Sequence, residues 1–191
     1  MTDPLPFTVA DVGAWRRWLD AHEHSSDGVW LVLAKKGTTE PTSLTYAEAL
    51  DEALCSGWID GQRRTRDAAT YVQRFTPRRA RSMWSLRNVD HIARLADAGR
   101  LRPRGQVEVD RARSDGRWER AYAGPATAEA PAELTRALDA SPVARERFAA
   151  LSSSARYSIL HPLLTAASPE TLTARVTRAV ASLEEEPASG S

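Results

Sequence analysis

Apolar side chains recur at helical spacing in the first part of the chain, where Val12, Trp15 and Leu19 form one stripe. Thr8, followed three residues later by Asp11, predicts the start of this helix, which we expect to run to about His22. The next segment, Val29 to Ala34, is an unbroken apolar run of strand length. Such a run predicts a strand buried on both faces, and we expect it at the centre of its sheet.

The following segments predict a helix and then a β-hairpin. Thr45 and Glu48 have the spacing of a capping box, so a second helix begins there, and Gly57 is a plausible stop. Residues Trp58 to Arg63 and Thr70 to Thr76 have strand patterns and are joined by a short polar turn.

The rest of the chain predicts helices only. A third helix follows Ser85 and a fourth begins at Pro103, whereas residues 124–132 have the composition of a linker. Further helix starts are expected at Pro131, Ser141-Pro142, Ser154 and Ser168-Pro169. We therefore predict an α+β fold, in which a small antiparallel β-sheet packed with helices (residues 1–123) precedes a helical C-terminal region (131–187) that packs on it.

Composition narrows the class of protein. The chain has 191 residues, 42% of them hydrophobic, which suffices for one medium domain with a helical extension. It lacks the roughly 18 consecutive apolar residues of a membrane span and a recognisable export signal, so no membrane insertion and a cytoplasmic location are expected. Cys55 is the single cysteine, and His22-Glu23-His24 has no third ligand, so no metal is predicted. Nucleotide-binding motifs are missing too, so no cofactor is expected.

Charge is distributed unevenly. The net charge is +1, but the segment from Trp58 to Arg104 holds 12 arginines against four aspartates, a net charge of +8, and the remainder carries −7. A basic segment in a near-neutral protein indicates either an anionic partner or an intramolecular match to the acidic remainder. Both interpretations stay open at this point.

The strongest candidate site lies between residues 74 and 85. Arginine presents a planar fork of donors that suits phosphate or carboxylate, and a following helix start adds free N–H groups. The residues expected to form this anion site are Arg74, Thr76, Arg78, Arg79 and Ser82, with Trp84 as an apolar wall. The alternative is a surface loop whose arginines pair with the acidic C-terminal helices.

Three further residues are candidates for the same site. Asp60, in Gly57-Trp58-Ile59-Asp60-Gly61, could orient Arg74 across the hairpin or act as a general base, although a structural role in a tight junction is the competing interpretation. Lys35 and Lys36 follow the buried strand and could add positive charge, or could simply lie in solvent.

Several motifs resemble the YdeI/OmpD-associated family, also called bacteriocin-protection proteins. The motifs that carry this resemblance are Ser26 to Leu31, Ala34 to Gly37, Leu44 to Leu50, Gly57 to Gly61, Arg74 to Arg79, Ser82 to Ser85, Asp115 to Trp118 and Ser168 to Thr171. The resemblance implies association with an outer-membrane porin and resistance to antimicrobial peptides. Ala167 and Leu172 stand where family members usually carry basic residues, so a basic contribution from this region is not expected.

Three functions remain in competition. The first is a non-enzymatic stress- and antimicrobial-protection protein that holds a small anionic ligand in the arginine-rich site. The second is a small enzyme acting on an anionic metabolite, with Asp60 as general base. The third is a nucleic-acid-binding protein, which a pI of about 8.0 disfavours because the acidic remainder would repel a long polyanion.

Overall fold

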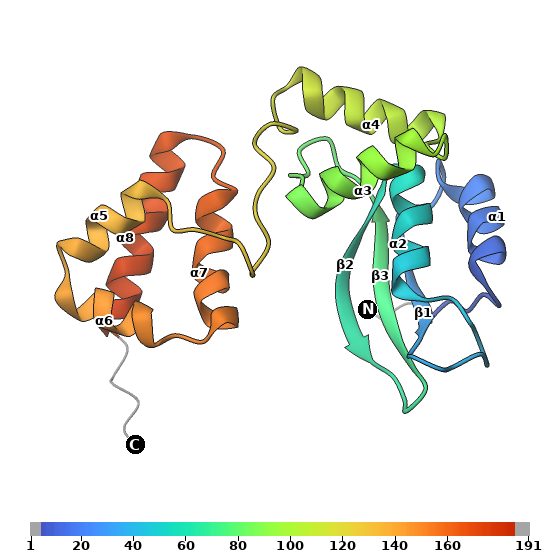
Figure 1. The fold of residues 1–191 in the computed structure, drawn as a ribbon, viewed down its shortest axis with the longest axis horizontal. Helices are drawn as coiled ribbons and strands as arrows, with labels where there is room; N and C mark the ends of the chain where they lie inside the picture. The colour runs from blue at the N-terminus through green and yellow to red at the C-terminus, as the bar shows by residue number, and fades with distance from the viewer. Residues whose placement is uncertain (1–4, 186–191) are drawn as a thin grey trace. The chain divides into compact units, whose positions relative to one another are not determined.

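The computed structural model describes residues 5–185, which divide into two units (Figure 1). The first comprises the described residues up to Ser82 together with Asn88–Glu119. The second comprises Met83–Arg87 together with the described residues from Arg120 onward. The α+β fold class is confirmed, since a three-stranded antiparallel sheet with helices precedes a helical region. The packing of the second unit on the first stays a prediction.

The helices and strands up to residue 114 follow the sequence pattern closely. They are α1 (Val12–His22), β1 (Val29–Ala34), α2 (Tyr46–Cys55), β2 (Trp58–Thr65), β3 (Thr70–Pro77), α3 (Leu86–Asp97) and α4 (Pro103–Ser114). The capping box of α2 is confirmed, with Thr45 and Glu48 bonded reciprocally. The prediction for α1 was wrong in one respect, because Asp11 rather than Thr8 is the N-cap, and its side chain accepts from the N–H of Ala14.

The sheet has the strand order β1-β3-β2, and both pairs are antiparallel. The expectation that β1 is central was therefore wrong, although its burial is confirmed: Trp30 is 7% exposed and Leu31 is fully buried. β1 is buried although it is an edge strand of the sheet, because Phe7 lies along its outer side. The N–H of Phe7 donates to the carbonyl of Trp30, and the carbonyl of Phe7 accepts from the N–H of Val32.

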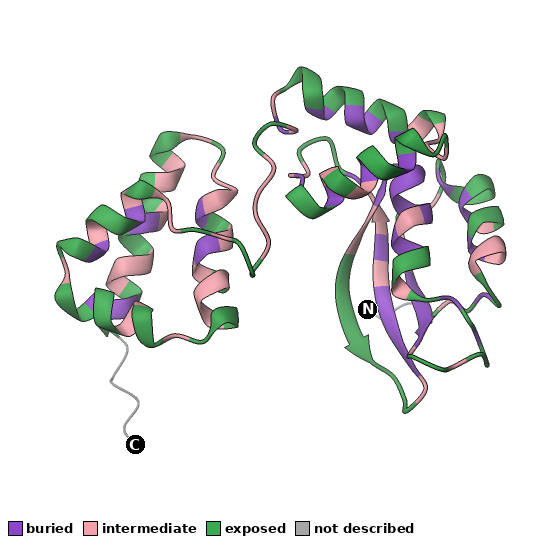
Figure 2. Ribbon diagram, in the orientation of Figure 1, coloured by how far each residue is buried: buried purple, intermediate pink, exposed green. Residues whose placement is uncertain are grey.

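Aromatic rings form the core between α1 and the sheet. Trp15 of α1 lies 5.8 Å from the ring of Phe75 in β3 and 6.4 Å from that of Trp58 in β2, and all three side chains are fully buried. Figure 2 shows β1 and β3 largely buried, whereas β2 is exposed over most of its length. The face bearing Phe75 is thus the helix-covered face of the sheet.

The opposite face carries a smaller apolar cluster of Trp30, Val32 and Val72. The guanidinium of Arg64 stacks on the ring of Trp30, 3.9 Å from its centroid. On the helix-covered face of the sheet, the guanidinium of Arg63 lies 3.9 Å from the centroid of the Tyr71 ring. In both contacts the guanidinium group covers an aromatic ring, which is the cation–π geometry that arginine favours.

Helix α4 crosses α2 at very short distance. Gly105 makes this possible, because a Cβ there would lie 2.3 Å from the carbonyl oxygen of Cys55. The N–H of Arg102 donates to the same carbonyl at 3.1 Å. A side chain at position 105 would therefore push the two helices apart.

The second unit is a group of four helices, α5 (Ala132–Asp139), α6 (Pro142–Ala150), α7 (Ser153–Leu164) and α8 (Pro169–Glu185). Ser141 and Ser152 are the N-caps of α6 and α7. The predicted buried side of the last helix is confirmed, since Val176 and Leu183 belong to the core and Leu172 and Val180 pack against it. Among the described residues, no helix has the length and apolarity that crossing a bilayer requires.

Candidate functional site

Arg74 and Thr76 lie on the face of the sheet opposite the helices. Side chains alternate along a strand, and Phe75 between them points toward α1, so its two neighbours point the other way. Gly28, with φ of 121°, lies directly against them: a Cβ there would be 2.7 Å from Cγ2 of Thr76 and 3.1 Å from Nη2 of Arg74. The structure therefore brings these two predicted site residues together, beside a backbone that only glycine allows.

The Arg74 guanidinium is incompletely satisfied. Its Nη2 donates to the carbonyl of Asp27 at a long 3.5 Å, and its Nη1 is buried with no hydrogen-bond partner among residues 5–185. No carboxylate of the described residues forms an ion pair with it. Arginine stays charged inside proteins, so this side chain holds a positive charge with spare donor capacity.

The residues after β3 form a tight turn. Arg78 is 5% exposed, and its N–H donates to the carbonyl of Gly57 at 3.0 Å. Arg79 is exposed, and its N–H donates to Oγ of Ser82 at 3.0 Å, while Arg117 donates to the carbonyl of Ser82 at 2.7 Å. The Ser82 hydroxyl thus stabilises the turn. Trp84 is buried and belongs to the second unit.

Asp60 does not join Arg74. It pairs with Phe75 in the β2–β3 register, so it lies on the helix-covered face, where Oδ2 accepts from the Tyr46 hydroxyl at 2.8 Å. The interpretation that Asp60 orients Arg74 across the hairpin therefore fails for a physical reason: directly paired residues share a face, and adjacent residues do not.

Lys35 and Lys36 lie at the other end of β1. Arg74 pairs with Trp30, whereas Lys35 follows Ala34, so the strand separates the two positions by about 16 Å. The Lys35 ammonium donates to the carbonyl of Asp67 at 2.6 Å, and Lys36 is exposed in a turn. The structure does not bring either lysine to Arg74.

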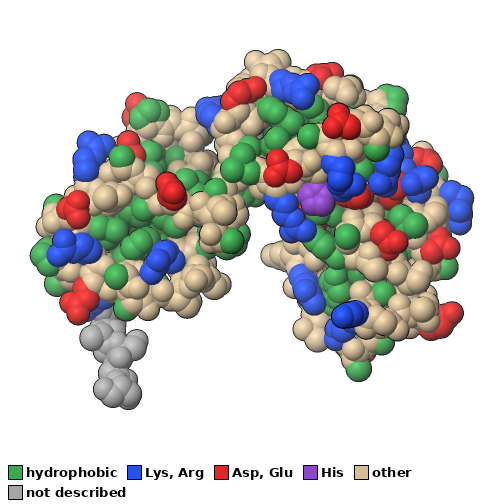
Figure 3. Space-filling model, viewed as in Figure 1, with side chains coloured by type: hydrophobic (Ala, Val, Ile, Leu, Met, Phe, Trp, Pro, Cys, Tyr) green, Lys and Arg blue, Asp and Glu red, His purple; other side chains and the backbone are tan. Residues whose placement is uncertain are grey.

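Part of the basic segment is neutralised within the first unit. Arg94, Arg100 and Arg102 form ion pairs with Asp51, Glu52 and Asp20, on the N-terminal side of the segment rather than in the C-terminal helices. Figure 3 shows acidic and basic side chains side by side on the helical side of this unit. The intramolecular interpretation thus holds for these three arginines, and Arg74 and Arg79 stand outside this network.

Glu52 is the centre of that network. Its side chain is 2% exposed, and it accepts from Arg16 at 2.6 Å, Arg100 at 2.7 Å and Arg102 at 2.8 Å. Burial by itself would raise the pKa of Glu52, but the hydrogen bonds from Arg16 and Arg100 and the nearby positive charges outweigh it, so the pKa is lowered. This carboxylate is therefore ionised and structural.

The second unit contains a groove that the sequence pattern did not predict. It lies between α7 and α8, has a volume of about 830 Å³, and is lined in part by Arg175 and Arg178. A signal was present in the sequence: two arginines three residues apart flank Val176, at the border of the buried stripe of α8. Among the described residues, no group of three or more His, Cys, Asp or Glu side chains could hold a metal ion.

Two protein-family models match separate parts of the chain. Residues 7–108 match the model of a domain of unknown function, DUF8412, and residues 127–186 match the model described as "Bacteriocin-protection, YdeI or OmpD-Associated". The chain belongs to the DUF8412 family, whose model covers just over half of it. Residues 127–186 form a domain of the YdeI/OmpD-associated family. No curated protein and no solved structure matches the chain.

The two matches divide the motifs that suggested the YdeI/OmpD-associated family. The motifs from Ser26 to Ser85 fall within the DUF8412 match, and Ser168 to Thr171 fall within the YdeI/OmpD-associated match. The motif from Asp115 to Trp118 lies in neither match. Ala167 and Leu172 also lie in the YdeI/OmpD-associated match, so their departure from the usual basic residues does not prevent the match of this region.

Proposed function

We propose that this protein, which carries a YdeI/OmpD-associated domain, is a non-enzymatic protein of the bacteriocin-protection type that binds a small phosphate- or carboxylate-bearing ligand. The ligand contacts Arg74 and Thr76 on the face of the sheet opposite the helices, and Arg78, Arg79 and Ser82 supply the adjoining turn. The observation that carries the proposal is the Arg74 guanidinium, whose Nη1 is buried without a hydrogen-bond partner in the described part of the chain.

A buried N–H donor of a charged group destabilises the fold when it makes no hydrogen bond, and a bound anion would accept that hydrogen bond. The guanidinium fork suits two oxygens of one phosphate or carboxylate, because its donors have a fixed planar geometry. Thr76 adds a hydroxyl on the same face, two residues along the strand. The backbone of Gly28 packs directly against both side chains, because a Cβ there would lie 2.7 Å from Cγ2 of Thr76.

The two competing functions have less support. Catalysis by Asp60 would require it beside the anion, yet Asp60 and Arg74 lie on opposite faces of the sheet. Single-stranded nucleic acid binds on exposed aromatic faces. Here Arg64 and Arg63 already cover one face of the Trp30 and Tyr71 rings.

The test is calorimetric titration of the full chain with inorganic pyrophosphate and, separately, with citrate at low ionic strength. Loss of a charged hydrogen bond corresponds to a decrease in affinity of about tenfold or more, which we expect for Arg74→Ala. Arg74→Lys should recover only part of the affinity, because lysine retains the charge without the fork. Arg66→Ala is the matched control, since Arg66 is exposed in the hairpin turn and lies 3.7 Å from Asp67.

Circular dichroism of each variant checks that the fold is retained. The proposal is wrong if neither anion binds the wild-type chain, or if Arg74→Ala and Arg66→Ala bind equally well. Full recovery by Arg74→Lys, together with loss of binding in moderate salt, would indicate a diffuse surface charge instead of a site.

A further inference from the structure

The groove between α7 and α8 has the dimensions of a small-molecule site. Its volume of about 830 Å³ lies within the range of about 300–1,000 Å³ that is usual for ligand pockets. It is built from the second unit alone, by the two helices and by Leu151, which precedes α7. It shares no residue with the Arg74 site, so the two can be tested separately.

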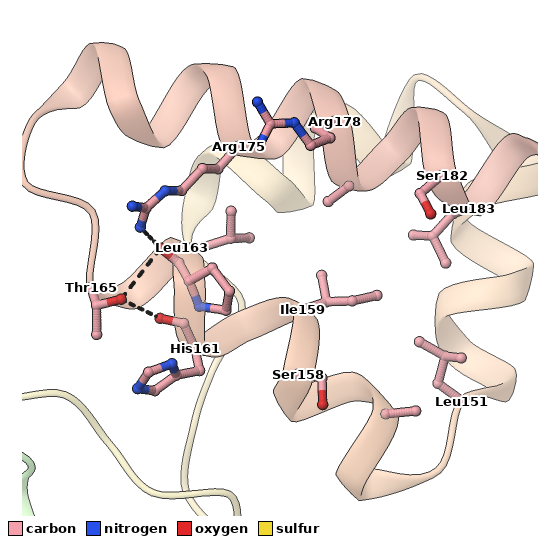
Figure 4. A pocket seen from close by; sticks show the side chains of 13 residues that line it. Leu151, Ser158, Ile159, His161, Leu163, Thr165, Arg175, Arg178, Ser182 and Leu183 are labelled. Carbon is pink, nitrogen blue, oxygen red and sulfur yellow. Dashed lines mark hydrogen bonds between the residues drawn. The ribbon is translucent and has the colours of Figure 1, made fainter. Parts of the chain in front are cut away.

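One part of the groove is mostly aliphatic, and the hydroxyls of Ser158 and Ser182 lie beside the apolar side chains (Figure 4). Ile159 of α7 points into the open space, Leu183 of α8 faces it, and Leu151 closes the end beside Leu183 (Figure 4). Ala179 also lines this stretch with a small side chain. Such a surface favours an apolar occupant, because each methylene removed from water contributes about 0.8 kcal/mol.

Polar groups gather at the other end, where α7 terminates. The Arg175 guanidinium donates to the carbonyl of Pro162, and the Thr165 hydroxyl donates to the carbonyl of His161 at 2.8 Å (Figure 4). These carbonyls belong to the C-terminal turn of α7, whose partial negative charge favours a cation. Arg175 is therefore fixed at this end of the groove through one nitrogen, and its other donors remain available.

The charge of the groove is unbalanced. Neither Arg175 nor Arg178 forms an ion pair with any carboxylate among residues 5–185, and Arg178 is exposed. The groove lining contains two arginines and no aspartate or glutamate. An occupant that complements this lining carries a negative group at one end and an aliphatic chain at the other.

We propose that the α7–α8 groove binds a medium-chain fatty acid, of about the length of decanoate or laurate. The carboxylate contacts Arg175, with Arg178 adding to the positive field, and the chain extends past Ile159 toward Leu183 and Leu151. A small anion would leave the aliphatic end unused, and a neutral lipid would leave both guanidiniums without a counterion. A cationic amphiphile would be repelled.

The first experiment measures how binding affinity depends on the chain length and the head group of the ligand. The full chain is titrated calorimetrically with octanoate, decanoate and laurate, each below its critical micelle concentration. We expect saturable 1:1 binding that tightens by about fourfold for each additional methylene that is fully buried. The comparison ligands are 1-dodecanol, which lacks the charge, and dodecyltrimethylammonium, which reverses it, and both should bind at least tenfold more weakly than laurate.

The second experiment separates the head-group contact from the chain contact. Arg175→Ala removes the positive charge at the head-group end and should weaken the binding of laurate by about tenfold or more. Ala179→Trp fills the groove without changing its charge and should also abolish tight binding. Arg136→Ala is the matched control, because Arg136 is an exposed arginine of α5 that pairs with Glu133 outside the groove. Arg74→Ala should bind laurate as the wild-type chain does.

Three results would overturn this proposal. The first is laurate binding that does not saturate at one molecule per chain. The second is equal affinity in Arg175→Ala and Arg136→Ala. The third is equal affinity for laurate and dodecyltrimethylammonium, which would indicate general apolar adsorption. Loss of pyrophosphate binding in Arg74→Ala with laurate binding intact would support both sites independently.

Discussion

Replacement of Glu52 by glutamine tests how the first unit is held together. Glutamine has the size of glutamate but no charge, so it removes the common partner of Arg16, Arg100 and Arg102. Breaking a buried ion pair from one side typically costs about 3–5 kcal/mol. Arg16 and Arg100 are 52% and 36% exposed and can turn toward water, so we expect the lower end, about 3 kcal/mol, for Glu52→Gln.

Urea unfolding followed by tryptophan fluorescence measures this loss. Five of the six tryptophans lie in the first unit, and Trp15 and Trp58 are fully buried, so the signal reports on that unit. With a slope of about 2 kcal/mol per molar urea, the midpoint should fall by about 1.5 M. Glu119→Gln is the control, because Glu119 is an exposed carboxylate of the same unit, and its midpoint should not move.

The pH dependence gives an independent check. The pKa of Glu52 is lowered in the folded chain, so its contribution to stability is present above the ordinary value of 4.5 and is lost as the pH falls through the lowered pKa. The difference in unfolding free energy between wild type and Glu52→Gln should therefore be largest near neutral pH and shrink in acid. A difference below about 0.5 kcal/mol at pH 7, or one unchanged at pH 3, would refute this reasoning.

Two further predictions concern the second unit and the cysteine. Val176 is 6% exposed in the helical core, so Val176→Asp should cost about 3 kcal/mol in thermal or urea unfolding followed by circular dichroism, whereas Thr177→Asp on the exposed side should have little effect. Equal stability of the two variants would contradict the predicted burial. Burial raises the pKa of the Cys55 thiol to about 11, so at pH 8 it should react with a disulfide reagent far more slowly in the folded chain than in urea. Similar rates in the two states would contradict this.

Local chemistry made much of the fold predictable. The Thr45–Glu48 capping box depends on neighbours in the sequence, and so do the helix starts at Pro142 and Pro169. The position of β1 could not be predicted in the same way. An apolar run indicates that a strand is buried, but it does not say what covers the strand. Here the segment around Phe7 and the side chain of Arg64 in β2 contribute to the cover of β1, and both are distant from it in the sequence.

The same distinction holds for the candidate sites. Alternation along β3 predicted that Arg74 and Thr76 share a face, and they do. The face of Asp60 depends on the hairpin register, which the residues of the turn did not determine. The α7–α8 groove depends on the way two helices pack, so the sequence showed its arginines and its apolar stripe without showing the space between them.

The outer edge of β2 has a consequence for association between chains. In the part of the chain that the structure describes, no strand pairs with this edge, and residues 61–65 are exposed. Unpaired edges invite a second chain to add a strand, and charged side chains and bulges discourage it. Arg63 and Arg64 are consecutive on this strand, with their guanidiniums over the rings of Tyr71 and Trp30 on its two faces. The pairing with β3 shifts between Asp60 and Arg63. Two such edges would meet with adjacent arginines and an irregular backbone, and both features disfavour the addition of a strand from a second chain.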